Sequence, residues 1–352
     1  MKSDQKFMVY MLGIVITTLL VLGGFTVVID PFFHYHSPLK RLQYPIEDER
    51  YQNDGIAKHF QYDAIITGSS MTDNFKTSEA DEVFQADFIK IPYSGAFYKE
   101  INDTLETAIE TNPDIHIIIR GLDASYMPVD KDRYVYDTYP DYLYDDNLAN
   151  DVNYFWNKSV LFDYSMKVLS YTSQGNQTTS FDLYSNWNSY SVFGKEAVDS
   201  VYQRPENSGT EQVWQSGDKE TLEKNIEQNV IRLVEDNPEI TFYLFIPPYS
   251  IYNWDYWNQT GTLQYQLEAQ KRTIEMLVQY DNIKLFSFFN NYELICDLSH
   301  YKDIVHYSED INSQILKWMK AGQYQLTEQN YLDYCREVEE FYTLYDYDSL
   351  FD

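Results

Sequence analysis

The longest apolar segment of the chain lies near its N-terminus. Residues 7–29 contain no charged side chain, and the segment is followed by Asp30-Pro31. A helix of this length, with a rise of about 1.5 Å per residue, can cross the roughly 30 Å hydrocarbon core of a bilayer. A cleaved signal peptide has a shorter apolar region that ends in an A-x-A pattern, which this segment lacks. The pattern therefore predicts an uncleaved transmembrane signal anchor.

Basic residues flank the anchor on both sides. Lys2 and Lys6 precede it in a short tail (1–6), and Lys40 and Arg41 follow it. Positive residues favour the cytoplasmic side of a membrane, and the two tail lysines favour a cytoplasmic N-terminus. We therefore expect a single-pass protein of the cell membrane whose main domain is extracytoplasmic.

Beyond the anchor, short apolar strands alternate with amphipathic helices. The run at 115–120 (IHIIIR) is almost wholly apolar, which is typical of a strand buried on both faces. Alternating strands and helices favour a parallel sheet with helices on both faces, so the expected fold class is α/β, a three-layer sandwich with a mainly parallel sheet, preceded by one transmembrane helix. The expected strands are 62–67, 88–91, 115–120, 241–246 and 283–286, and the expected helices are 98–111, 219–235, 264–280, 308–320 and 327–345.

The alternation breaks between residues 128 and 217. This stretch is rich in Tyr, Asp, Asn and Ser, and it is too long for a loop without structure of its own. We expect it to form an insertion or lid on the main domain. The predicted organisation is a tail at 1–6, an anchor at 7–29, a juxtamembrane linker at 30–60, a main domain at 61–325, and a C-terminal helix with an acidic tail at 326–352. The end of that tail, 337–352, is expected to fray.

Composition narrows the class of protein. The 352 residues carry a formal net charge of −29, which would repel phosphate backbones and argues against a nucleic-acid binder. Aromatic residues make up 17%, so wholesale disorder is excluded. The two cysteines, Cys296 and Cys335, can form at most one disulfide, and we expect two free, buried thiols.

Small and polar residues follow the first four expected strands. In a doubly wound sheet, functional side chains collect at the carboxyl ends of the strands. These residues are Gly68-Ser69-Ser70 after the first strand, Gly95 after the second, Gly121-Leu122-Asp123 after the third, and Pro247-Pro248-Tyr249-Ser250 after the fourth.

A catalytic triad can be assembled from three of the polar residues. A serine hydroxyl is a poor nucleophile until a base takes its proton, and the base needs a partner that orients it. Ser70, His306 and Asp303 can take these three parts, because an aspartate three residues before a histidine can reach its Nδ1. Asp297 is an alternative orienting carboxylate.

These residues resemble blocks of the SGNH (GDSL-like) hydrolase superfamily. Gly68-Ser69-Ser70, Gly95 and Asp303-x-x-His306 are similar to blocks I, II and V, over roughly residues 62–320 without the insertion. The nearest branch is membrane-anchored and extracytoplasmic, and includes proteins of lipoteichoic-acid D-alanylation and polysaccharide O-acetylation. The resemblance implies Ser70 as nucleophile, the Gly95 N–H as oxyanion donor, Asp303 as orienting residue and His306 as base.

The chain departs from the family pattern at two positions. Block I usually has Asp where Ser69 stands, and block III appears only as Gly121-Leu122-Asp123, without the asparagine that donates to the oxyanion. An ionised carboxylate cannot donate, so we expect a slow enzyme. Ser69, Asp123 and Tyr249 are retained as candidate substrate-binding or oxyanion-site residues.

The resemblance implies an esterase or acyltransferase that acts on O-acyl groups of a cell-surface polysaccharide or another acylated envelope polymer. The alternative is a catalytically degenerate module of the same fold, which binds glycan or partners a membrane acyltransferase. Clusters of Tyr and Trp at 134–144 and 249–257 can stack on sugar rings or simply pack in the core.

Other chemistries have no support in the sequence. It contains no P-loop, GxGxxG, HExxH or CxxC motif, so neither a nucleotide nor zinc is expected, and no cofactor is predicted. His34 and His36 could pair on a metal ion, but we expect them in a juxtamembrane loop without one.

Overall fold

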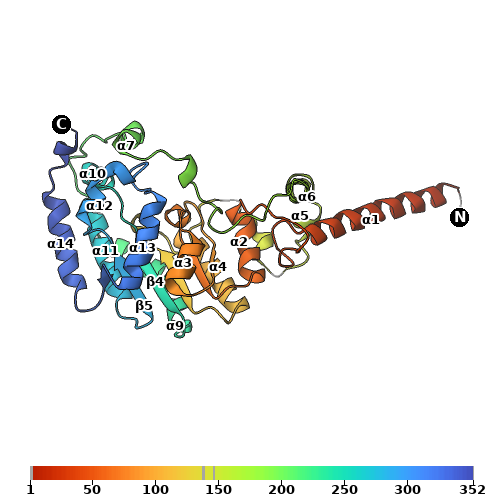
Figure 1. Cartoon of the computed structure of the whole chain (residues 1–352), viewed down its shortest axis with the longest axis horizontal. Coiled ribbons are helices and arrows are strands. Elements are labelled where there is room, and N and C mark those ends of the chain that lie inside the picture. Colours follow the sequence, from red (N-terminus) through yellow and green to blue (C-terminus); the bar gives the residue numbers. More distant parts are fainter. Residues whose placement is uncertain (1–2, 137–138, 146, 352) are drawn as a thin grey trace. The chain divides into compact units, whose positions relative to one another are not determined.

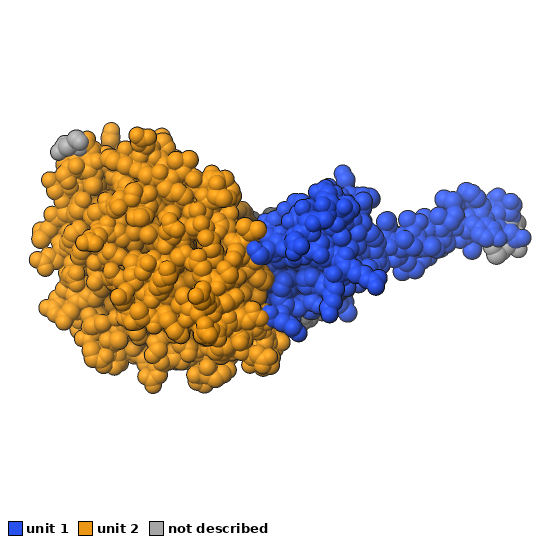
Figure 2. Space-filling model, in the orientation of Figure 1, with its two compact units in different colours: residues 1–61, 138–180 blue, residues 62–137, 181–352 orange. Residues whose placement is uncertain are grey.

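The computed structural model describes residues 3–136, 139–145 and 147–351. It consists of two compact units (Figure 2). Unit 1 comprises residues 1–61 and 138–180, and unit 2 comprises residues 62–137 and 181–352.

Unit 1 contains the expected apolar helix. Helix α1 is long and apolar enough to cross a membrane. Residues from 138–180 pack around Phe32 in a small core that includes Leu143, Tyr154 and Val160. The helices of unit 1 are α1 (Ser3–Ile29), α2 (Glu49–His59), α5 (Val152–Phe155) and α6 (Ser165–Ser173), with a π-helical turn at Val160–Tyr164 before α6 (Figure 1).

A buried aspartate fixes the turn that follows α1. Asp30 has a φ of 45°, and its carboxylate accepts hydrogen bonds from the backbone N–H groups of His34 (3.0 Å), Tyr35 (2.8 Å) and His36 (3.0 Å). The Tyr154 hydroxyl adds a fourth at 2.6 Å. Because buried carboxylates need such donors, this cluster folds the start of residues 30–60 into unit 1, where a linker was expected.

Unit 2 is α/β, as the sequence predicts, and is built on a six-stranded sheet of order β2-β1-β3-β4-β5-β6. The first five strands are parallel, and β6 is antiparallel to β5. The short β6 was not predicted, because two residues carry no periodicity. The strands are β1 (Ala64–Thr67), β2 (Phe88–Lys90), β3 (Ile117–Gly121), β4 (Thr241–Ile246), β5 (Ile283–Ser287) and β6 (Gln325–Leu326).

Most of the helices in unit 2 lie between consecutive strands. Helix α3 packs against β2 and α13, and α11 packs against β5, α8 and α14. The helix expected at 219–235 is α8 and α9 joined by a π-helical turn at Glu227–Ile231. The helices are α3 (Thr77–Phe84), α4 (Tyr98–Thr111), α7 (Lys195–Val201), α8 (Ser216–Ile226), α9 (Arg232–Asp236), α10 (Ile251–Gln259), α11 (Leu263–Leu277), α12 (Tyr292–Cys296), α13 (Glu309–Ala321) and α14 (Tyr331–Leu344).

The stretch 128–217 is divided between the units, in contrast to the single insertion expected. Residues 138–180 belong to unit 1, and residues 181–217 belong to unit 2, where Tyr184 and Trp187 are buried. The division follows from long-range contacts, such as the Tyr154 hydrogen bond to Asp30, that local composition does not encode.

The C-terminal tail packs against unit 2 instead of fraying. Tyr342 is buried, stacks on Trp254 with ring centroids 3.4 Å apart, and donates to the Phe289 carbonyl at 2.7 Å. Tyr347 is also buried and donates to the Tyr342 carbonyl at 2.8 Å. The acidic composition of the tail favoured the prediction that it frays, but its buried tyrosines Tyr342 and Tyr347 hold it against unit 2.

Both cysteines are free, but neither is fully buried as expected. Cys296 is exposed, and Cys335 is half-buried. Cys296 is the last residue of α12, and Cys335 lies within α14.

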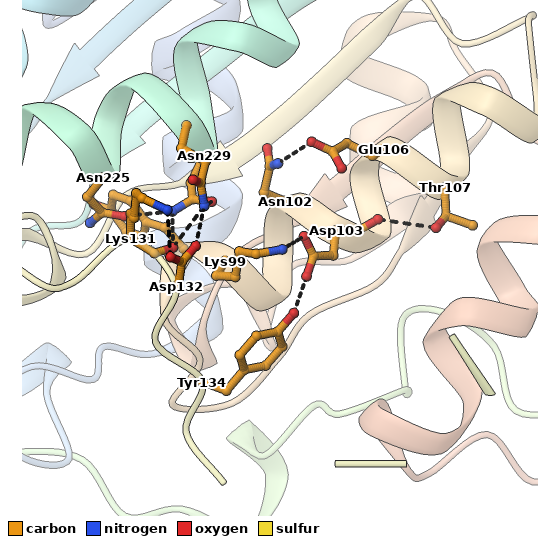
Figure 3. Close-up of polar contacts among 12 residues, drawn as sticks. Lys99, Asn102, Asp103, Glu106, Thr107, Lys131, Asp132, Tyr134, Asn225 and Asn229 are labelled. Carbon is orange, nitrogen blue, oxygen red and sulfur yellow. Dashed lines mark hydrogen bonds and ion pairs between the residues drawn. The ribbon is translucent and has the colours of Figure 1, made fainter. Parts of the chain in front are cut away.

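A polar network holds the segment that follows β3 (Figure 3). The Asn225 amide donates to the carbonyls of Tyr126 and Met127, both at 3.0 Å. The Asn229 amide donates to the Lys131 carbonyl at 2.8 Å. At the other side Lys99 and Tyr134 both bind the Asp103 carboxylate of α4. These bonds fix the chain just after Asp123 against α4 and α8.

Candidate active site

The turn after β1 depends on a glycine. Gly68 has a φ of +152°, and a Cβ there would lie 2.7 Å from Thr72 Cγ2. Only glycine accepts both that conformation and that contact without strain. After this turn, the Ser69 carbonyl accepts from Thr72 N–H at 2.9 Å, which starts a 3₁₀ turn at Ser70–Thr72. The Ser70 side chain is thereby presented at the carboxyl edge of the sheet.

The structure brings Ser70, His306 and Asp303 together. Ser70 Oγ lies 2.8 Å from His306 Nε2, and His306 Nδ1 lies 2.8 Å from Asp303 Oδ2 and 3.0 Å from Oδ1. All three distances are within hydrogen-bond reach. The alternative carboxylate, Asp297, instead faces His300 Nε2 at 3.6 Å. The serine–histidine–aspartate arrangement therefore has the geometry expected from the sequence.

Asp303 also shapes the loop that carries the histidine. Its Oδ1 accepts from the backbone N–H groups of Val305 (2.9 Å) and His306 (2.8 Å). The loop is held to the end of β4 by Ser250, whose Oγ and N–H donate to the Ile304 carbonyl at 2.7 and 3.0 Å. Burial alone would raise the pKa of Asp303, but the hydrogen bonds from His306 and Val305 lower it below its ordinary value. The carboxylate is therefore ionised and can stabilise an imidazolium.

Two residues that sequence reasoning missed lie against the histidine. The Trp187 ring meets the His306 ring edge-on, with centroids 5.4 Å apart. Lys302 Nζ lies 3.6 Å from the centroid of the Trp187 ring, within the range of a cation–π contact, and burial lowers the pKa of Lys302. The adjacency of Lys302 to Asp303 was a usable signal, but nothing local in the sequence pointed to Trp187.

Gly95 lies in a loop that is tied to the nucleophile turn. Tyr93 N–H donates to the Gly68 carbonyl at 2.8 Å, and Ser94 Oγ donates to Asp73 Oδ2 at 2.8 Å. Gly95 has a φ of +71° and no atom within 4 Å of the place its Cβ would take. In the hydrogen bonds of residues 3–136, 139–145 and 147–351, neither Gly95 N–H nor Ser70 N–H donates to a protein acceptor. Neither N–H group is therefore occupied by another hydrogen bond within these described residues.

Asp123 contacts the nucleophile turn through Ser69, and its carboxylate accepts hydrogen bonds there. Its Oδ2 accepts from Ser69 Oγ, and its Oδ1 accepts from the Tyr249 hydroxyl at 2.5 Å. Ser69 Oγ in turn accepts from Met71 N–H at 3.4 Å. Burial raises the pKa of Asp123 above its ordinary value, although the two hydroxyl donors oppose the shift. The three candidates Ser69, Asp123 and Tyr249 therefore form one buried cluster that supports the Ser70 turn.

This cluster predicts a pH-dependent effect of Asp123→Asn. A carboxyl whose pKa is raised by folding contributes stability that is present below its unfolded pKa, about 3.9, and is lost as pH rises through the folded value. The asparagine variant lacks this loss. We therefore expect wild type to lose unfolding free energy relative to Asp123→Asn as pH rises from about 4 towards 8, measured by urea unfolding in detergent micelles. Equal pH profiles for the two proteins would contradict the raised pKa.

A scan against protein-family models finds no match for this chain, and a search of curated proteins likewise finds none. Within the described ranges, no group of three or more His, Cys, Asp or Glu side chains is placed to hold a metal ion. In unit 1, His36 Nε2 lies 3.0 Å from the Val27 carbonyl, and His34 Nε2 lies 3.5 Å from Asp151 Oδ1.

The arrangement can carry out nucleophilic acyl chemistry. His306 is placed to remove the Ser70 proton, and Asp303 is placed to hold the imidazole in the tautomer that leaves Nε2 free. The side chains of His306 and Asp303 are 22% and 29% exposed, so both are partly open to solvent.

Proposed function

We propose that this chain is a membrane-anchored, extracytoplasmic serine esterase or acyltransferase with an SGNH-type three-layer α/β sandwich. Its substrate is proposed to be an O-acyl group on a cell-surface polysaccharide or another envelope polymer. The observation that carries the proposal is the hydrogen-bonded chain Ser70–His306–Asp303, with 2.8 Å at each link. Such a chain is the arrangement that activates a serine for attack on an ester.

The proposed reaction proceeds in two halves. His306 Nε2 takes the Ser70 proton while Oγ attacks the acyl carbonyl, and the resulting oxyanion accepts hydrogen bonds from the N–H groups of Ser70 and Gly95. The tetrahedral intermediate collapses, His306 returns the proton to the leaving alcohol oxygen, and the acyl group stays on Ser70. Water or an acceptor hydroxyl then attacks the acyl carbonyl while His306 takes its proton. The acyl–Oγ bond of this second tetrahedral intermediate breaks, and His306 returns the proton to Ser70 Oγ.

The proposed reaction can be tested with a fluorophosphonate probe, which phosphonylates activated serines. We expect the full-length protein to label and Ser70→Ala to show no labelling. Ser200→Ala is the control, because this exposed serine of α7 donates only to the Ala197 carbonyl and its loss leaves the Ser70–His306 pair and the cluster beneath it intact. Equal labelling of wild type and Ser70→Ala would overturn the enzyme proposal.

A second candidate function is a glycan-binding module or a partner of a membrane acyltransferase, with a degenerate site. The observation that favours it is Asp123, which accepts from Ser69 and Tyr249 and so offers no donor for an oxyanion. Binding of an acetylated polysaccharide without fluorophosphonate labelling would support this candidate over the enzyme.

The proposed anchor predicts that the protein is found in the membrane fraction of the cell. Helix α1 spans 27 residues and is apolar throughout its middle. We expect the full-length protein to remain with membranes after washing with high salt or alkaline carbonate, checked by ultracentrifugation and immunoblotting. A protease added outside the cell should digest unit 2 if the proposed orientation holds. A released, shortened chain that begins near Asp30 would contradict an uncleaved anchor.

A further inference from the structure

Residues 152–166 of unit 1 pack directly against the C-terminal half of α1. Trp156 Nε1 donates to the Leu19 carbonyl at 2.9 Å, and Thr26 Oγ1 donates to the Phe155 carbonyl at 3.0 Å. Gly23 permits this approach, because a Cβ there would lie 3.3 Å from Trp156 Nε1. Helices α5 and α6 lie beside the C-terminal half of α1 (Figure 1).

The same segment exposes large apolar side chains. Trp156, Phe162 and Met166 are 43%, 61% and 48% exposed, and Val152 is 46% exposed. They come from α5, the residue directly after it, the π-helical turn and the start of α6, and these three elements all contact α1. We call Val152, Trp156, Phe162 and Met166 the collar. An exposed apolar surface beside a membrane-spanning helix would be costly in water.

The length of α1 places the collar at the depth of the membrane. Unit 1 begins to cover α1 at Leu22 and buries Thr26 and Ile29. The uncovered apolar stretch, residues 7–21, is only about 22 Å long at 1.5 Å per residue. A hydrocarbon core of about 30 Å requires about 20 residues, which extends from Phe7 to Thr26. Trp156 binds at Leu19, well inside that stretch.

From these observations we infer that the collar is immersed in the outer leaflet, so that unit 1 inserts into lipid beside α1. The occupant of the collar is the lipid bilayer itself, from the upper acyl chains of the outer leaflet to the level where headgroups meet acyl chains. Tryptophan is enriched at that level because its ring is apolar and its N–H is polar. The inference rests on the membrane anchor proposed above.

Charged residues within the segment limit how deeply the collar sinks. Lys158 and Asp163 are exposed between collar residues, and Lys167 pairs with Glu47. A lysine can bury its alkyl stem and extend its ammonium group to the lipid phosphates, whereas Asp163 must remain in water. These charges therefore place the segment at the interface and not across the hydrocarbon core.

The immersion can be tested with tryptophan quenching by brominated acyl chains. Full-length variants Phe162→Trp, Leu20→Trp and Leu332→Trp are reconstituted into vesicles of phosphatidylcholine with and without bromine on the acyl chains. All three positions are exposed, on the collar, on α1 and on α14 of unit 2 respectively. The signal is the emission that each variant adds to that of the wild-type protein with its six tryptophans.

We expect the emission added at Phe162 and at Leu20 to be mostly lost in brominated vesicles, and that added at Leu332 to be retained. Quenching at Leu20 without quenching at Phe162 would overturn the collar while leaving the anchor intact. No quenching at Leu20 would overturn the anchor itself and the collar with it. Quenching at Leu332 as strong as that at Phe162 would also overturn the collar, because unit 2 would then contact lipid as much as unit 1 does.

Discussion

Ser70→Ala and His306→Ala are each expected to lower kcat for acyl-ester cleavage by about 10⁴-fold or more. The reason is that the serine and its base act together across the 2.8 Å contact, so removing either one removes the nucleophile or its activation. The double variant should be no slower than either single variant, because triad losses do not add. The measurement is steady-state hydrolysis of a p-nitrophenyl acyl ester by purified full-length protein.

Asp303→Asn should cost about 10- to 100-fold less than either alanine variant, because the serine and the base both survive. Asp297→Asn is the matched control. Asp297 lies three residues before His300, as Asp303 lies three residues before His306, but Asp297 caps a 3₁₀ turn. Its substitution should therefore leave the rate of ester cleavage unchanged. A rate loss for Asp297→Asn equal to that for Asp303→Asn would refute the assignment of the orienting carboxylate.

Trp254→Ala is expected to lower the free energy of unfolding by about 3–5 kcal/mol. Trp254 is fully buried, stacks on Tyr342 of α14 at 3.4 Å, and meets Phe289 edge-on at 4.9 Å. Its removal leaves a cavity between α10 and the C-terminal helix that neighbouring rings cannot fill. Urea unfolding in detergent micelles measures the loss.

Tyr256→Ala on the same helix is the control for that measurement. Its side chain is 41% exposed, so the expected change is within about 0.5 kcal/mol. A similar loss for Tyr256→Ala and Trp254→Ala would mean that α10 is destabilised as a helix, and that docking of α14 is not what Trp254 supports.

The local pattern of the sequence determined the elements and the edge of the sheet that carries the site. Strands at 64–67, 117–121 and 241–246 are short apolar runs, and burial dictates such composition wherever a parallel strand is covered. The carboxyl ends of parallel strands share one edge of the sheet. The sequence alone therefore predicted that this edge carries Gly68-Ser69-Ser70, Gly95 and Asp123. The spacing of Asp303 and His306 likewise predicted their contact.

Contacts between segments far apart in the sequence decided how the insertion and the C-terminal tail pack. Trp187 contacts His306 because residues 181–217 fold onto unit 2. Residues 138–180 belong to unit 1 because they contact Asp30 and α1. The docking of Tyr342 on Trp254 reversed the expected fraying of the tail. Such pairings gain their free energy from burying surfaces that meet only in the folded chain, and local periodicity carries no information about which surfaces meet. The sequence by itself determined the five parallel strands, the apolar helix and the residues of the candidate triad, and the tertiary structure alone decided what packs around them.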